Sequence, residues 1–150
     1  MADIIFKKEY VIRLDRTTTI IVNPYEAIKK GFKKTTLRIK PLKTGIYKAK
    51  HGSYYKPIYW DYKLHIYRVR VVSINELTDE ELKEDIGLTD EQFELLTSKI
   101  PIKEHFLQML IKFNKRRIAE TGIEITLDTP MCLHYFKIVD DSDMALDKFL

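Results

Sequence analysis

The chain has 150 residues, 45% of them hydrophobic and 32% charged, which is enough for one domain with its own core. No apolar run approaches the roughly 18 residues that a membrane span needs, and no apolar stretch near the start is typical of a secretory signal, so we expect a cytoplasmic protein without a membrane partner. The single cysteine, Cys132, excludes an internal disulfide and a thiolate-rich zinc site.

The net charge of +4 is distributed unevenly along the chain. From Ala27 to Trp60 there are ten basic residues and no acidic one, so the rest of the chain carries a net charge of −6. Most of that negative charge lies between Glu76 and Glu94, where there are nine acidic residues and one basic residue, Lys83. We therefore expect one basic and one acidic side to the molecule, and the basic side should attract phosphates.

Before the basic block, the residues predict a hairpin and a short helix. Residues 10–22 are rich in β-branched side chains around a polar break, which predicts two antiparallel strands. Asn23 is a suitable N-cap, Pro24 suits the first helical position and Gly31 suits the stop. These start and stop signals predict a helix between Asn23 and Gly31.

Within the basic block, residues 35–40 alternate as a strand. Leu37 and Ile39 form its predicted apolar face. The opposite face is predicted to carry Thr36, Arg38 and Lys40.

The next segment predicts more strand and then the acidic helices. Residues 45–60 predict a strand followed by a long exposed loop, and residues 62–73 predict a strong strand. Two capping boxes, Thr78 with Glu81 and Thr89 with Gln92, each predict the start of a short helix. We expect the acidic segment to be helical.

The last third predicts a long helix and two strands. A helix is expected from Pro101 to Thr121, a strand at 123–127, and a strand apolar on both faces at 131–139, which suggests a central position. Residues 140–150 predict a short amphipathic helix. This order of elements indicates a mixed sheet or small barrel with helices packed on it, in one domain over 1–150.

The segment 31–38, Gly-Phe-Lys-Lys-Thr-Thr-Leu-Arg, resembles the signature of the ASCH domain family, a branch of the PUA-like superfamily, in which a helix ends in Gly-x-Lys-x-x-Thr-x-Arg. Lys43-Thr44-Gly45 resembles the family's next turn, residues 69–87 its strand and following helix, and residues 131–139 its closing strand. The resemblance covers about 9–139. It implies an α+β fold, a small mixed PUA-like β-barrel with helices packed on it and a helical insert.

The first functional hypothesis is that a basic, aromatic-containing cleft binds RNA, single-stranded nucleic acid or a modified nucleotide. Cations without acids bind phosphates in a salt-dependent way, and aromatic rings between them offer stacking surfaces for unpaired bases. The predicted ligand-binding residues are Lys34, Arg38, Lys40, Lys48, Lys50, Tyr54, Tyr55 and Trp60.

The second hypothesis is enzymatic and rests on the resemblance. Bacterial members of the ASCH family hydrolyse 4-acetylcytidine with a lysine, a threonine and a glutamate, and the matching positions here are Lys33, Thr36 and Asp85. The resemblance therefore implies a small amidohydrolase, with Thr36 as nucleophile. The sequence leaves open whether the protein is an enzyme.

A third hypothesis is a protein-interaction adaptor that uses the acidic helices. Other chemistry has little support, because the four histidines lack metal-ligand spacing and no glycine-rich phosphate loop is present. We expect neither a metal nor a cofactor.

Overall fold

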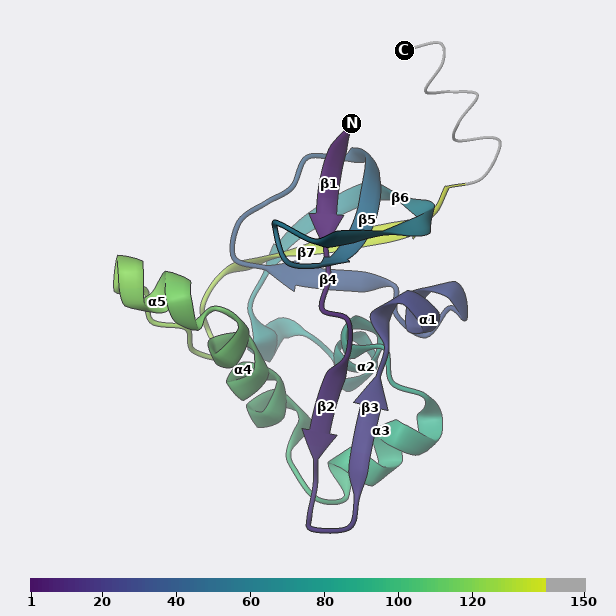
Figure 1. The fold of residues 1–150 in the computed structure, drawn as a ribbon. Helices are drawn as coiled ribbons and strands as arrows, with labels where there is room; N and C mark the ends of the chain where they lie inside the picture. The colour runs from purple at the N-terminus through teal and green to yellow at the C-terminus, as the bar shows by residue number, and fades with distance from the viewer. Residues whose placement is uncertain (140–150) are drawn as a thin grey trace.

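The structure is a computed structural model that describes residues 1–139. Figure 1 shows a five-stranded sheet at the top, with a separate β-hairpin and most of the helices below it. The strands are β1 (Ala2–Ile5), β2 (Tyr10–Arg13), β3 (Thr19–Val22), β4 (Thr35–Arg38), β5 (Gly45–Gly52), β6 (Pro57–Val72) and β7 (Met131–Ile138). The α-helices are α1 (Pro24–Lys29), α2 (Asp79–Ile86), α3 (Asp90–Thr97), α4 (Ile102–Phe113) and α5 (Lys115–Thr121).

The larger sheet is mixed and open. Its strand order is β1-β5-β6-β7-β4, in which β1 runs parallel to β5 and every other pair is antiparallel. The predicted α+β class is confirmed, but no closed barrel is found in the part of the chain that the structure describes. The edge strands β1 and β4 do not pair, and between them the Arg38 guanidinium donates a hydrogen bond to the Ile5 carbonyl at 2.8 Å.

The core has two parts. The larger part lies between the sheet, the β2–β3 hairpin and α2 to α4, and it includes Val22, Leu82, Phe106 and Leu133. The smaller part is formed by side chains of β1, α1, β5, β6 and β7, and its members are Ile4, Phe6, Ile28, Tyr47, Ala49, Leu64, Ile66 and Phe136. Burial against two cores holds β7 in the interior of the sheet, as the sequence predicted.

The helix starts that were predicted from capping residues are confirmed. The Asn23 side chain accepts a hydrogen bond from the Glu26 backbone N–H at 3.1 Å, and both predicted capping boxes are formed at α2 and α3. Gly87 ends α2 in the left-handed conformation, with φ of 92°. These signals act within one helical turn, so they do not depend on the rest of the fold.

The long exposed loop predicted between the basic strands is wrong. The chain instead forms a hairpin: β5 runs to Gly52, residues 53–56 turn, and β6 begins at Pro57 and continues to Val72. The Lys56 backbone N–H closes the turn on the Ser53 carbonyl at 3.2 Å. β1 was not predicted, because its four residues are held by pairing with β5 and not by a local signal.

Two predictions in the last third also need correction. The expected helix 101–121 is interrupted at Asn114, whose Nδ2 donates to the Leu110 carbonyl at 2.8 Å and so ends α4. Residues 123–127 form no strand, because the Thr126 N–H donates to the Thr129 hydroxyl in a local turn. The predicted helix at 140–150 lies outside the described residues.

The predicted polar face of β4 is only partly exposed: Thr36 is buried, Arg38 is half-buried, and Lys40, beyond the end of the strand, is exposed. Thr35, Thr36 and Leu37 are all buried, since α2 packs against one side of the strand and β7 pairs along its length. Polar side chains on this strand must therefore find partners inside the protein. That requirement shapes the site described next.

Candidate functional site

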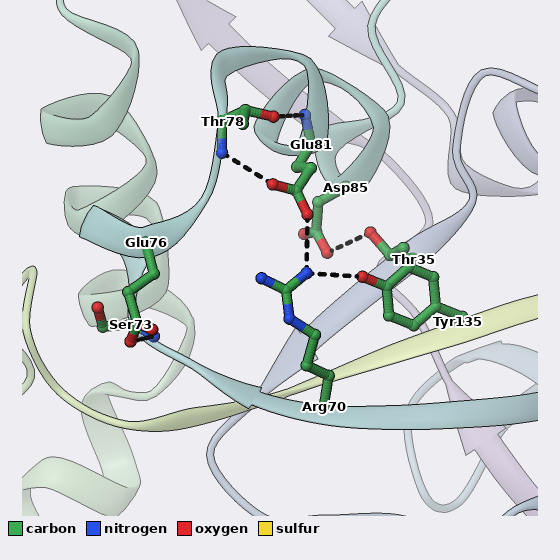
Figure 2. A network of polar contacts seen from close by, with 8 residues as sticks. All are labelled: Thr35, Arg70, Ser73, Glu76, Thr78, Glu81, Asp85 and Tyr135. Carbon is green, nitrogen blue, oxygen red and sulfur yellow. Dashed lines mark hydrogen bonds and ion pairs between the residues drawn. The ribbon is translucent and has the colours of Figure 1, made fainter.

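Helix α2 is held against the sheet by polar contacts near both of its ends (Figure 2). Near its start, Glu81 accepts a hydrogen bond from Arg70 of β6 at 3.1 Å, and Arg70 also donates to the Tyr135 hydroxyl at 3.1 Å. Near its end, the Asp85 carboxylate accepts from the Thr35 hydroxyl of β4 at 2.9 Å. These contacts place Asp85, from the acidic segment between Glu76 and Glu94, next to β4 of the basic block.

Lys33 completes this buried cluster. Its side chain is 3% exposed, and its ammonium donates to the Thr35 carbonyl at 2.9 Å and to the Asp85 carbonyl. Gly87 is a close neighbour: a Cβ atom added there would lie 3.0 Å from the Lys33 Cβ. The lysine of the Lys-x-x-Thr motif therefore joins β4 to the end of α2 and is not a surface cation.

Burial sets the protonation behaviour of the cluster. Loss of water contact, with a smaller effect from the Arg38 charge, lowers the pKa of Lys33 to about 8, although the Asp85 carboxylate partly opposes this. Burial also raises the pKa of Asp85, against the opposing charge of Lys33. Tyr10, which is partly buried, has its pKa raised to about 12 by burial and by the Asp85 charge. Such perturbed groups gather at functional sites and in structural ion pairs alike.

Next to this cluster lies an open cleft of about 870 Å³. It is bounded by β4 and residues 39–42, the connection from β1 to β2, the tip of the β5–β6 hairpin, and the junction of α4 with α5. Its cations are Lys7, Lys8, Arg38, Lys40 and Arg117, and its aromatic rings are Phe6, Tyr10 and Phe113. Among residues 1–139, no acid lines this cleft.

The predicted site residues divide between three places. The cleft is lined by Thr36, Arg38 and Lys40, while Lys33 and Asp85 belong to the buried cluster beside it. Lys34 lies 3.8 Å from Glu84 at the surface, and Lys50 pairs with Asp3 at 3.1 Å. Lys48 and Trp60 line a second, smaller hollow on the β5–β6 hairpin, which shares no lining residue with the cleft.

Two predicted stacking residues lie in solvent. Tyr54 and Tyr55 are 86% and 88% exposed in the turn of the hairpin, and their rings contact each other edge to face at 5.3 Å. They line neither the cleft nor the smaller hollow. The hairpin tip contributes only Gly52 and Ser53 to the cleft.

Several residues of the cleft were not predicted from the sequence. Lys7, Lys8 and Tyr10 precede the basic block, and Phe113 and Arg117 come from α4 and α5. The contact that brings these segments together is the stacking of Tyr10 on Phe113, with ring centroids 5.2 Å apart. No local sequence pattern predicts this contact, because it joins residues about 100 positions apart.

The geometry bears on the enzymatic hypothesis. A threonine nucleophile needs a base within hydrogen-bonding reach of its hydroxyl. The Lys33 ammonium donates to the backbone carbonyls of Thr35 and Asp85, and the hydroxyl that Asp85 holds is that of Thr35 rather than Thr36. In this arrangement Lys33 and Asp85 are positioned to hold α2 on β4.

Other candidate groups have structural partners. His134 is fully buried, its Nε2 accepts from the Leu42 N–H at 2.8 Å, and its Nδ1 faces the Thr36 carbonyl at 3.1 Å. Cys132 is buried in β7. Over the described residues, no group of three His, Cys, Asp or Glu side chains is placed to hold a metal ion, and no helix is long and apolar enough to cross a membrane.

Comparison with known proteins shows which solved structures share the fold. No protein-family model matches the chain, and no curated protein matches it in sequence. Among solved structures, a crystal structure of an Enterococcus faecalis V583 protein of family DUF984 is similar over 77% of this chain and 66% of that chain, with a TM-score of 0.52 and 15% identity. An ASCH domain from Lactobacillus crispatus JV V101 is similar over 76% of this chain and 69% of that one, with a TM-score of 0.49 and 18% identity.

At 15% identity, the first similarity shows the fold alone, and it spans about two thirds of that neighbour's length. The chain therefore has the α+β architecture of this class of domain. The resemblance to ASCH domains that the sequence suggested is therefore supported at the level of the fold.

Proposed function

We propose that this chain is a nucleic-acid-binding domain that holds single-stranded RNA or a modified nucleotide in the cleft beside β4. The observation that carries the proposal is the composition of the cleft: five cations, three aromatic rings and no acid among residues 1–139, in a volume of about 870 Å³. Cations without countercharges attract phosphates, and exposed ring faces stack with unpaired bases. The ASCH-like fold is consistent with this function, since PUA-like domains are associated with RNA.

The arrangement favours a single strand over a duplex. Of the three rings, Phe113 is exposed, and the Lys7 ammonium lies 5.2 Å from its centre; Tyr10 stacks on Phe113, and Phe6 is buried in the cleft wall. Bases can reach such rings only when they are unpaired and splayed away from a helix. The cations around the rings would then hold the phosphates on either side of a stacked base.

The experiment uses two adjacent arginines of α5. Arg117 lines the cleft, whereas Arg116 points into solvent and pairs with Glu120 at 3.0 Å. Both substitutions to alanine remove one positive charge, so only position distinguishes them. A fluorescently labelled single-stranded RNA is titrated with wild type, Arg117→Ala and Arg116→Ala at several salt concentrations.

We expect Arg117→Ala to weaken binding and to reduce the slope of log affinity against log salt by about 0.7, the value for one phosphate contact on a single strand. Arg116→Ala should bind like the wild type. Equal losses in both variants would show only a nonspecific response to net charge. No binding at low salt, or binding indifferent to salt, would refute the proposal.

One observation favours a second candidate, the amidohydrolase. Lys33, with a pKa lowered to about 8, lies in a buried cluster with Asp85 directly under the strand that carries Thr36. A lysine base needs such a lowered pKa. This candidate predicts acetate release from 4-acetylcytidine, abolished by Thr36→Ala in a variant that keeps its fold and its RNA affinity. Turnover that survives Thr36→Ala would exclude Thr36 as the nucleophile.

A further inference from the structure

The second hollow, on the β5–β6 hairpin, carries an unusual pair of charges. Lys48 and Lys63 lie directly opposite each other on the paired strands β5 and β6, and both line this hollow of about 270 Å³. Like charges directly opposite on paired strands destabilise a sheet. Within residues 1–139 neither lysine forms an ion pair, so the repulsion between them is not neutralised by the protein.

The nearby acids are already engaged. Asp3 accepts hydrogen bonds from Lys50 at 3.1 Å and from the Tyr59 hydroxyl at 2.8 Å, and Asp61 accepts from the Tyr25 hydroxyl at 2.7 Å. Asp3 is close enough to Lys48 for the lysine charge to help lower its pKa, but its direct hydrogen bonds go elsewhere. An external anion is therefore the partner that the two opposed lysines lack.

Between the lysines and the hairpin tip, the register of β5 against β6 shifts from Lys48 to Lys50. A bulge of this kind re-aims the side chains of the bulged strand. Here it lets Trp60 and Tyr62 line the same hollow as Tyr59. The hollow therefore combines aromatic faces with two cations.

The polar atoms of the three rings are all bonded within the protein. The Trp60 Nε1 donates to the Nδ1 of His51 at 2.8 Å, the Tyr62 hydroxyl donates to the Tyr25 carbonyl at 2.8 Å, and the Tyr59 hydroxyl donates to Asp3. Trp60 is also fixed by stacking on Phe6, with centroids 5.1 Å apart and planes 17° from parallel. A ligand in the hollow meets fixed ring surfaces and two ammonium groups, of which that of Lys48 lies 6.0 Å from the centre of the Tyr59 ring.

We infer that this hollow is a nucleotide-binding subsite, in which Lys48 and Lys63 hold a phosphate and the base stacks against the aromatic surface of Trp60 and Tyr62. Its volume suits one nucleotide rather than several. The inference deepens the proposed function, because Phe6 lines the cleft, Trp60 lines the hollow, and these two stacked rings separate the sites. One strand could place successive nucleotides on the two sides of that wall.

Trp60 is the only tryptophan of the chain, so intrinsic fluorescence reports on this hollow. The probe is adenosine 5′-monophosphate, compared with adenosine and with inorganic phosphate. We expect saturable quenching by the monophosphate, much weaker quenching by adenosine, and competition by inorganic phosphate. Lys63→Ala should weaken the monophosphate at least about tenfold, the effect of one charge-assisted hydrogen bond. Lys56→Ala, in the turn of the same hairpin, should leave it unchanged.

A second variant separates binding from structure. Lys63→Glu places opposite charges across the strands, so it should raise the midpoint of thermal unfolding while it abolishes quenching by the monophosphate. Absence of quenching in the wild type, or equal quenching in Lys63→Glu, would overturn the inference. A loss in Arg117→Ala as large as that in Lys63→Ala would also overturn it, because quenching would then report the cleft.

The two proposals can fail separately. If labelled RNA binds with the expected dependence on Arg117 but the monophosphate does not quench Trp60, the subsite is wrong and the cleft proposal stands. If the monophosphate quenches Trp60 and requires Lys63 while RNA does not bind, the subsite stands and the proposed function is wrong.

Discussion

Replacing Asp85 by asparagine tests whether the buried Lys33–Asp85 cluster holds the site together. The substitution keeps the shape of the side chain and removes its negative charge. Asp85 and Lys33 are only 6% and 3% exposed, and Arg38 adds a second positive charge nearby. The variant leaves the Lys33 ammonium in a buried place without its countercharge.

The expected cost follows from that burial. Removing one partner of a buried ion pair in direct contact destabilises a protein by about 3–5 kcal/mol. Because the Lys33 ammonium bonds to the Asp85 carbonyl and not to its carboxylate, we expect a cost at the lower end of that range, about 3 kcal/mol. Domains are stable by roughly 5–15 kcal/mol, so Asp85→Asn should remove a large fraction of the free energy of unfolding. Lys33→Met combined with Asp85→Leu removes both charges. That double variant should cost only about 1–3 kcal/mol, for the Thr35 hydroxyl and the carbonyls that lose their partners.

Urea unfolding at pH 7 measures these differences. The matched control is Glu84→Gln, one position earlier on α2, whose carboxylate makes only a surface contact of 3.8 Å with Lys34 and should contribute less than about 1 kcal/mol. The reasoning is refuted if Asp85→Asn unfolds within about 1 kcal/mol of wild type. It is also refuted if the double variant loses as much stability as Lys33→Met and Asp85→Leu, measured separately, added together.

Two further predictions concern the same region. The pKa of Lys33 is about 8 in the folded protein and 10.5 without the fold, so the unfolded chain binds more protons between these values and stability should rise with pH across that window, by up to about 3 kcal/mol. Lys33→Met should abolish this rise; unfolding curves at pH 7.5 and 10 that show the same rise in both proteins would contradict it. Gly87 and Gly122 both end helices at positive φ, so alanine at either costs about 1–2 kcal/mol. Only at Gly87 would the new Cβ lie 2.9 Å from Ala27 and 3.0 Å from Lys33, which should add about 1–3 kcal/mol; equal unfolding midpoints for the two variants would refute this.

The sequence predicted those elements whose signals are local. Asn23 and the capping boxes at Thr78 and Thr89 satisfy backbone groups within one turn, so their meaning does not depend on distant residues. β1 has no such signal and exists because it pairs with β5. The break at Asn114 is local, but helical periodicity continues through it and conceals it.

For the site, too, local features could be predicted from the sequence and long-range contacts could not. The acid-free basic block indicated an excess of positive charge, because charge is a property of the composition. It did not indicate that Lys34 and Lys50 would pair with Glu84 and Asp3, which lie outside the block. It could not indicate that antiparallel pairing of β5 with β6 would carry Lys48 and Trp60 to a separate hollow. Nor could it indicate Arg117, which reaches the cleft only because α4 and α5 pack beside Tyr10.

The motif at residues 31–38 has the same residue types whether it binds or catalyses, so its role depends on where the hydrogen bonds go. Lys33 joins β4 to α2, and Arg38 joins the end of β4 to the end of β1 through the Ile5 carbonyl. Both cations thereby fix the floor and one edge of the cleft that Thr36 lines. For Lys33 to act as a base on Thr36, its ammonium would first have to lose a proton and exchange two backbone carbonyls for a hydroxyl. A ligand held by electrostatic attraction requires neither change, which is the physical reason why we propose binding rather than catalysis for the cleft.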